Sequence, residues 1–307
     1  MTDVTPAPER PTRLRLSLES LALLALALLV TTWFAGWPGG LPTWVPSLLL
    51  GALLGIGAVT CRPCVPRPHL ETWAVLALAV AYRLPALLHP WGLVNRDGAY
   101  GAYVALHLLA GQRPAPVFTE GANYQGTLKG HLAALFSLIT GWHDFSFHLT
   151  AAGVVLSLIF ILATMALARR LGGRGAALAT GLYLALGPKF LTIFTLNNVG
   201  QYADILALGG LALALLARLL DLGLGGPPAR GHYLGLGLLL GAAFWQQPVA
   251  LSYAAAAGLV LLLRRRTRRD PWALLAPLGF LLGALPVLLW NLQPGWASGD
   301  IMGKDTD

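Results

Sequence analysis

Long apolar runs alternate with short polar segments along most of the chain. The longer runs are sufficient to cross about 30 Å of hydrocarbon as helices. They lack the strict apolar and polar alternation of a membrane β-barrel, and an unpaired backbone amide in lipid is costly, so the runs predict transmembrane helices. The predicted spans, about nine in all, are Leu18–Ala35, Trp44–Val59, Thr72–His89, Phe147–Ala168, Gly175–Phe194, Ile205–Leu219, His232–Trp245, Val249–Leu263 and Trp272–Trp290.

Composition supports a membrane protein of the all-α class. Hydrophobic residues make up 56% of the 307 residues and charged residues only 11%, whereas roughly a quarter of an ordinary soluble domain is charged. The net charge of +8 comes from short basic clusters between apolar runs. Such clusters are typical of membrane topology, so membrane lipids rather than nucleic acid are the expected partners.

The distribution of basic residues predicts the orientation. Most of the 21 Lys and Arg residues fall in loops on one side of the predicted bundle, which the positive-inside rule assigns to the cytoplasm. The N-terminus is therefore expected in the cytoplasm and the C-terminus outside the inner (plasma) membrane. The predicted parts are a cytoplasmic tail 1–17, an added hairpin of two spans 18–60, a transmembrane core 72–291 and an external tail 292–307.

One apolar stretch, Leu128–Thr140, is too short for a span. Counting it as one would also place the later arginine clusters outside, so we interpret it as an interfacial or re-entrant helix. A long external loop, residues 89–145, then precedes the fourth span, and loops of this length are usually functional. The loop also contains a predicted surface helix, with Asp97 at its N-cap and Gly111 just past its end.

The loop contains, in order, an acid after a span, a surface helix, the turn Gly111-Gln112-Arg113-Pro114, a Tyr124-x-Gly126 element and a second surface helix. This order resembles that of the multispanning GT-C glycosyltransferases, particularly bacterial relatives of the protein mannosyltransferases and of the lipid A aminoarabinose transferase. The resemblance covers roughly Thr72–Asn291. It implies a GT-C-like bundle that transfers a sugar from a polyprenyl-phosphate carrier to an acceptor at the outer face, with inversion.

The resemblance also implies roles for individual acids. Asp97 occupies the position of the catalytic base; the alternative is a helix cap paired with Arg96. Relatives usually carry a second acid next in the chain, where this sequence has Gly98. Asp204, in the later external turn that includes Gln201, matches a place where relatives carry a polar or acidic site residue, although an acid there can equally be a solvated cap.

A phosphate leaving group requires positive charge, and sugar binding requires polar and aromatic groups. The external candidates for the phosphate are Arg96, Lys129 and Lys189, with snorkelling to the headgroups as the alternative for each lysine. The candidates for the sugar are Tyr124, Gln125, Gln246 and Gln247, and the aromatic residue is also typical of an interfacial belt.

Arg83 lies within the third predicted span, so it must be either paired or functional. Cys61 and Cys64 form a lone Cys-x-x-Cys with no second pair to complete a zinc site, and we interpret them as free thiols. The histidines have no metal-ligand spacing on one helix face. The sequence therefore predicts no metal site and no cofactor.

Two other classes of function stay open at this point. A lipid-linked sugar transporter or flippase would also need many helices and a polar cavity, but it should carry buried charge in several spans. A non-catalytic relative of the GT-C fold would keep the bundle without the base. The chain ends soon after the ninth predicted span, where family members continue, so we expect acceptor binding either to be lost or to be provided by a partner chain. The acceptor itself is not predicted.

Overall fold

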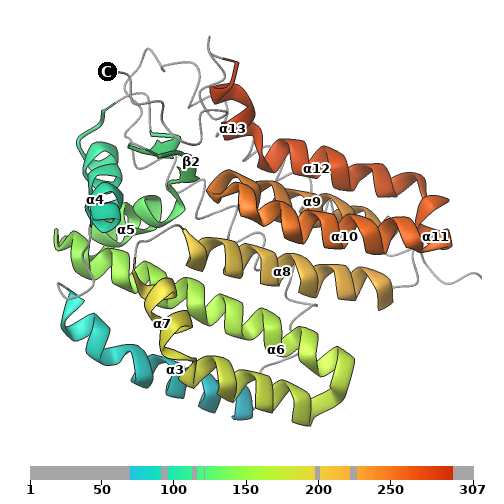
Figure 1. Ribbon diagram of the computed structural model, residues 1–307, viewed down its shortest axis with the longest axis horizontal. Helices are drawn as coiled ribbons and strands as arrows, with labels where there is room; N and C mark the ends of the chain where they lie inside the picture. Colours follow the sequence, from blue (N-terminus) through green and yellow to red (C-terminus); the bar gives the residue numbers. More distant parts are fainter. Residues whose placement is uncertain are drawn as a thin grey trace, which may run out of the picture.

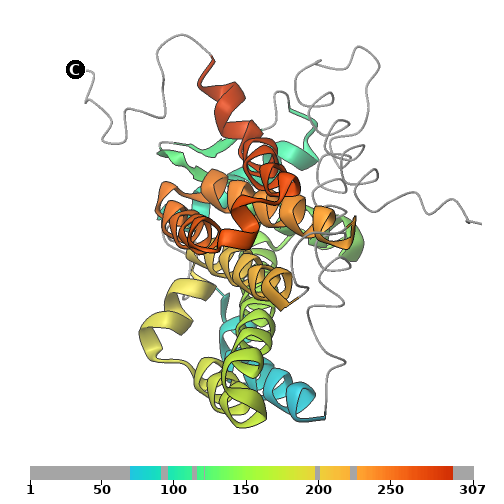
Figure 2. The same ribbon diagram turned by 90° about the vertical axis from the view of Figure 1, so that its right-hand side faces the viewer.

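The computed structural model describes residues 70–90, 96–112, 116–120, 122–197, 201–221 and 227–292, and these are nearly all helical. Helices α8, α9, α10 and α12 run alongside one another, and β2, α4 and α5 gather at one end of the bundle (Figure 1). Figure 2 views the stacked helices end on. The elements are α3 Leu70–Leu88, α4 Arg96–Leu109, β1 Phe118–Thr119, β2 Ala122–Gly126, α5 Leu128–Thr140, α6 Phe145–Leu186, α7 Lys189–Leu196, α8 Tyr202–Asp221, α9 Pro227–Gln246, η2 Pro248–Ala250, α10 Leu251–Leu263, α11 Arg265–Arg268, η3 Pro271–Leu274, α12 Leu275–Gly283 and α13 Leu285–Trp290.

The membrane character of the bundle is clearest in three of the described helices. By length and composition, α3, α6 and residues Tyr202–Leu220 of α8 can each cross a membrane, while α4, α5, η2 with α10, and η3 with α12 form shorter apolar segments. The predicted count of nine crossings is not confirmed. The first two predicted spans, the cytoplasmic tail and the Cys61–Cys64 pair lie outside the described residues.

Helix α6 contains two predicted spans in one assigned element. Its 42 residues would extend about 63 Å if straight, twice the hydrocarbon thickness. The backbone breaks at Gly173 (φ 76°, ψ −164°), a conformation that essentially only glycine adopts, and the chain folds back there (Figure 1). The break agrees with the predicted boundary between the fourth and fifth spans. The fifth was expected to reach Phe194, but it ends at Leu186, and Gly187 and Pro188 separate it from α7.

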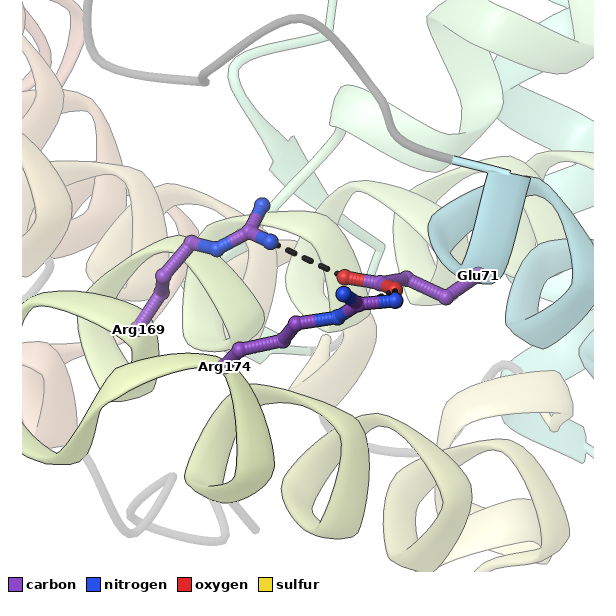
Figure 3. A network of polar contacts seen from close by, with 3 residues as sticks. All are labelled: Glu71, Arg169 and Arg174. Atoms are coloured by element: carbon purple, nitrogen blue, oxygen red, sulfur yellow. Dashed lines mark hydrogen bonds and ion pairs between the residues drawn. The ribbon is translucent and has the colours of Figure 1, made fainter.

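A charged network holds this fold-back against the start of α3 (Figure 3). The carboxylate of Glu71 accepts from Arg169 Nη2 at 2.9 Å and from Arg174 Nε at 2.7 Å. The two arginines flank Gly173 on either side, so one acid ties both arms of α6 to α3. An exposed pair contributes little, but Glu71 is only 14% exposed and binds two partners, which favours a fixed turn.

The last predicted span is also interrupted. Instead of one helix over Trp272–Trp290, the chain forms η3, α12 and α13, with a break at Ala284 just before Pro286. Proline lacks the N–H that would continue the ladder, which explains a break at this point. A hydropathy pattern cannot detect such an interruption, because the residues on both sides are apolar.

Glycines pack α9 directly against α12. A Cβ at Gly237 or Gly241 would lie within 2.1 Å of a backbone oxygen of α12, and a Cβ at Gly279 or Gly283 would lie 2.3 Å from a backbone oxygen of α9. The two helices therefore meet through reciprocal Gly-x-x-x-Gly faces, a packing mode common between membrane helices. A cluster of buried apolar side chains packs α8 against α9 and includes Leu208, Leu215, Leu236 and Leu240.

The loop before α6 contains the two predicted surface helices. Helix α5 spans the predicted residues, and the turn after α4 has Gly111 at φ 77°, as expected for a glycine past a helix end. Helix α4 begins at Arg96, so Asp97 is its second residue and lies inside the first turn. The prediction that Asp97 is the N-cap residue is therefore wrong. The short antiparallel hairpin of β1 and β2 was not predicted.

Candidate functional site

Helices α5, α7, α8 and α9 approach one another at one end of the bundle (Figure 1), and buried polar side chains gather there. We define the polar cluster by its four most informative members: Lys129, Gln201, Asp204 and Gln246. They come from the first turn of α5, the residue before α8, the first turn of α8 and the last residue of α9. Each is at most 4% exposed. Polar groups this deeply buried normally have hydrogen-bond partners, so each unpaired atom in the cluster requires an explanation.

Lys129 is the cation of the polar cluster. Its ammonium donates to the backbone carbonyl of Asn197 at 2.8 Å and to that of Thr195 at 3.3 Å. These carbonyls lie at the C-terminal end of α7, where helix carbonyls lack intrahelical partners and attract positive charge. An ammonium has three N–H donors. The third has no hydrogen-bond partner among the described residues.

Burial changes the proton affinity of two groups on α5, a helix of 13 residues and so about 20 Å long, too short to cross the membrane. Burial lowers the pKa of Lys129 to about 8, while the nearby charge of Asp204 acts to raise it. Burial also lowers the pKa of His131, against a raising effect from its contact with the Thr127 carbonyl. At neutral pH, therefore, Lys129 is largely charged and His131 is neutral.

Asp204 is the acid of the polar cluster and is fully buried. Neither of its carboxylate oxygens has a hydrogen-bond partner within the described part of the chain. No direct ion pair to Lys129 is formed at 4 Å or less among these residues, although the two charges interact. A buried carboxylate without hydrogen-bond partners is energetically costly. Such a carboxylate close to a buried cation therefore indicates a candidate ligand-binding site.

Three amide side chains complete this pattern. Gln201 Oε1, Gln246 Nε2 and Gln247 Oε1 are buried without a partner in the described residues. Gln201 also has a positive φ of 53°, which is uncommon for a residue other than glycine and costs of order 1 kcal/mol or more. Strain and unpaired polar atoms occur together here, at the entrance to α8.

The C-terminal end of α9 is joined to the hairpin of β1 and β2. Gln246 Oε1 accepts a hydrogen bond from the Leu128 amide at 3.1 Å, and Trp245 Nε1 donates to the Val117 carbonyl at 2.9 Å. Gly126 passes so close that a Cβ there would lie 2.7 Å from Gln246 Oε1. The joint therefore connects residues 118 positions apart in the chain and sets where α5 begins.

Helix α4 brings the predicted base towards the same place. Gly130, next to Lys129, packs so tightly on α4 that a Cβ would lie 2.5 Å from Val104 Cγ1 and 3.1 Å from the Gly101 carbonyl. Gly101 is about one helical turn after Asp97. The backbone of Asp97 thus lies one turn from this contact. The side chains of Arg96 and Asp97 are outside the described set.

The remaining predicted residues divide into two groups. Tyr124 and Gln125 are half-buried on β2, and the Gln125 carbonyl accepts from Thr119. Lys189 is exposed at the start of α7, the opposite end from the carbonyls that bind Lys129. The structure brings Lys189 to none of the cluster residues, and its predicted role in phosphate binding stays a prediction.

Arg83 proves to be paired, and its partners are backbone carbonyls. Its guanidinium donates to Ala185 O at 2.8 Å, to Leu184 O at 3.3 Å and to Ala79 O at 3.1 Å. The first two lie in the last turn of α6, so Arg83 caps that helix from α3. Sequence reasoning left open whether Arg83 was paired or functional, and these contacts indicate a structural role.

Two residues of the site region were not predicted. Asn197, whose carbonyl binds Lys129, has an unpaired buried Oδ1, and His131 lies edge-on to Trp245 with 6.4 Å between ring centroids. The Asn197-Asn198 pair in an external turn was a signal for the first. No sequence signal separates His131 from the other interfacial histidines.

Fold and site together define a helical membrane protein with a buried ionic cluster at one end of its bundle. Residues 127–290, more than half of the chain, match the dolichyl-phosphate-mannose-protein mannosyltransferase family. The chain therefore belongs to this family of membrane glycosyltransferases of the GT-C type, as the resemblance in the sequence indicated. Neither the curated proteins nor the solved structures compared with the chain gave a match. The matched region contains the whole polar cluster.

Proposed function

We propose that this protein transfers a sugar from a polyprenyl-phosphate carrier to an acceptor at the outer face of the membrane, with inversion at the anomeric carbon. The observation that carries the proposal is the polar cluster. It holds a buried ammonium with a free donor next to unpaired carboxylate and amide groups, inside the region that matches the mannosyltransferase family. A sugar phosphate offers complementary chemistry to both halves of the cluster.

In this proposal Lys129 binds the carrier phosphate. The phosphodiester of the donor is an anion, and a charge-assisted hydrogen bond to a buried ammonium is among the stronger contacts a protein can make. As the bond between the anomeric carbon and the phosphate oxygen breaks, the electron pair stays on the phosphate. A cation held at that oxygen stabilises the developing charge more than it stabilises the bound donor.

The acceptor-rich half of the cluster orients the sugar. Gln201 Oε1, Gln247 Oε1 and both oxygens of Asp204 are hydrogen-bond acceptors without partners among the described residues. Sugar hydroxyls are donors that would satisfy these atoms. Hydrogen bonds from these hydroxyls would offset the desolvation penalty of the buried acceptors, which favours a hydroxyl-rich ligand over an apolar one.

Asp97 is the proposed base. It takes the proton of the acceptor hydroxyl while that oxygen attacks the anomeric carbon from the side opposite the phosphate. The proposal is supported by the tight packing of α4 on Gly130, which holds the first turn of α4 close to the start of α5. A positioned base contributes typically ~10²- to 10⁴-fold to such a step.

Mass spectrometry of envelope glycolipids and glycoproteins tests the proposal. We expect a hexose-sized mass increment on at least one acceptor in cells that express the wild-type protein. The increment should be absent in cells without the gene and in cells expressing Asp97→Asn at the same level. An identical glycan profile in all three strains would contradict transferase activity, whereas carrier movement without transfer would favour a flippase.

A further inference from the structure

Helix α5 begins at a position that its own N-cap residue does not stabilise. The first N–H groups of a helix lack intrahelical partners, and a side chain at the N-cap usually accepts from one of them. Thr127 stands at the N-cap of α5 but makes no such bond; its hydroxyl donates instead to the Pro116 carbonyl at 3.1 Å. The amide of Leu128 is capped by Gln246, from the end of α9.

This remote cap is built with little freedom. Gln246 is fully buried, and its Oε1 lies 3.1 Å from the Leu128 amide. Gly126 leaves no room for a side chain beside it, since a Cβ there would meet Gln246 at 2.7 to 2.8 Å. The neighbouring Trp245 binds the Val117 carbonyl, on the other side of the hairpin. Two consecutive α9 side chains therefore hold both ends of the segment that leads into α5.

The residue after Leu128 is Lys129, whose ammonium must reach two carbonyls of the α7 end. A small rotation of the first turn of α5 would carry the ammonium away from these carbonyls and from Asp204. We propose that Gln246 is a positioning residue that sets the Lys129 ammonium by capping α5 from α9. This role rests on the proposed function, because Lys129 binds the donor phosphate there. The side-chain oxygen of Gln246 then stabilises the start of α5 rather than contacting the sugar.

A double-mutant cycle on the reconstituted full-length protein tests the inference. Gln246→Leu removes the acceptor at nearly constant volume, and we expect the KM for the polyprenyl-phosphate donor to rise about three- to tenfold with little change in kcat. In a Lys129→Met background the same substitution should have no further effect on KM. Additive effects, or a loss confined to kcat, would overturn the proposal.

Three further variants protect the test from misfolding. Gly126→Ala crowds the same joint and leaves both Gln246 and Lys129 in place, so it should raise the donor KM in the same way. Gln246→Glu keeps an oxygen for the Leu128 amide and should retain donor affinity better than Gln246→Leu. Ser252→Ala removes an exposed hydroxyl from the following turn and should leave KM unchanged. A normal KM in Gly126→Ala would count against the proposal.

A measurement without donor separates this inference from the proposed function. Lysine acylation followed by peptide mass spectrometry should show Lys129 protected in the wild type and labelled faster in Gln246→Leu. The exposed Lys189 serves as the internal standard. If the wild type shows no transfer but Lys129 becomes reactive in Gln246→Leu, the proposed function fails and the positioning role stands. Equal protection of Lys129 in both proteins would refute the positioning role.

Discussion

Two regions of the protein are each built around a buried cation that binds the carbonyls at the end of a helix. Arg83 binds Leu184 and Ala185 in the last turn of α6, and Lys129 binds Thr195 and Asn197 at the end of α7. Both arrangements satisfy carbonyls that would otherwise be unpaired. As helix caps, the two are equivalent.

The surroundings of the two cations differ. Among the described residues, Arg83 donates to backbone carbonyls and lies beside an apolar cluster that includes Val75 and Ile161, and its own Nε is buried without a partner. Around Lys129 lie the free carboxylate of Asp204 and the unpaired amides of Gln201 and Gln246. The unpaired atom at Arg83 belongs to the cation itself, whereas the unpaired atoms around Lys129 are contributed by other residues. In our proposal, unpaired groups gathered from several elements, rather than burial or charge, distinguish a binding site from a structural contact.

The largest expected effect concerns the base, because our proposal assigns Lys129 and Asp204 to binding and proton removal to Asp97. Asp97→Asn keeps the size of the side chain but removes its charge and its proton affinity. We expect the transfer rate to fall ~10²- to 10⁴-fold, whereas loss of a negative charge from the first turn of α4 should cost no more than ~1 kcal/mol of stability. The rate in a reconstituted assay with saturating donor measures this.

Asp204→Asn is the matched control for the base. It should cost less in rate than Asp97→Asn, since Asp204 is expected to balance the charge of Lys129 and to orient the sugar. If Asp97→Asn transfers sugar at the wild-type rate while Asp204→Asn does not, the assignment of the base to α4 is wrong and the polar cluster contains it.

The next largest effect tests whether Lys129, which is buried, binds the donor phosphate while Lys189, which is exposed, does not. Hydrogen bonds to charged groups contribute about 1.5–3 kcal/mol, so Lys129→Met should weaken donor binding roughly 10- to 100-fold. Lys189→Met should leave it unchanged, because Lys189 is exposed at the far end of α7. Binding of a fluorescent polyprenyl-phosphate analogue to the purified protein measures both. Weaker binding in Lys189→Met alone would reverse the assignment.

Lys129→Met also leaves Asp204 as a buried charge without its partner, which is usually destabilising. The double substitution Lys129→Met with Asp204→Asn should therefore recover thermal stability without recovering donor binding. Recovery of both properties would show that neither residue contacts the donor.

A smaller effect follows from the pKa of Lys129, which burial lowers to about 8. The ammonium is charged below this pH and neutral above it, whereas the donor phosphodiester keeps its charge throughout. Donor affinity should therefore be constant up to about pH 7 and decline as the pH rises through 8, by up to tenfold per unit. The KM measured from pH 6 to 9.5 gives this profile. In Lys129→Arg the guanidinium stays charged, so a decline that persists there would have another origin.

The sequence predicts some of these features because they depend on local composition. The lengths of the apolar runs predicted α3, α5 and the two arms of α6. Gly111 predicted the end of α4. Lys129 was a candidate because a carrier phosphate requires positive charge, and Gln246 because sugar binding requires polar groups. The resemblance to the GT-C enzymes added Asp97 and the turn that includes Gln201 and Asp204, and the family match covers all four residues of the polar cluster.

Other features depend on packing that no local pattern contains. Lys129 and Lys189 have similar apolar neighbours in the sequence, and only the fold buries one and exposes the other. The partners of Arg83 are main-chain carbonyls, which every residue possesses, so no side chain identified them. The β1 and β2 strands have two and five residues, too few for a recognisable alternation. The break at Ala284 interrupts a run that is apolar on both sides.

The smallest effect on function is expected for Arg83, and it completes the comparison. Arg83→Met keeps an apolar stem but leaves the Ala185 and Leu184 carbonyls unpaired, which should lower stability by about 1–3 kcal/mol. Donor KM and kcat should stay within twofold of wild type at temperatures where the variant is folded. Thermal unfolding in detergent and steady-state assays on the same preparation measure the two properties. Arg83→Lys restores the charge, but it replaces a planar five-donor guanidinium that reaches three carbonyls with a compact ammonium, so it should recover only part of the stability. If Arg83→Met changed the donor KM while unfolding at the wild-type temperature, Arg83 would belong to a binding site, and the distinction between the two buried cations would fail.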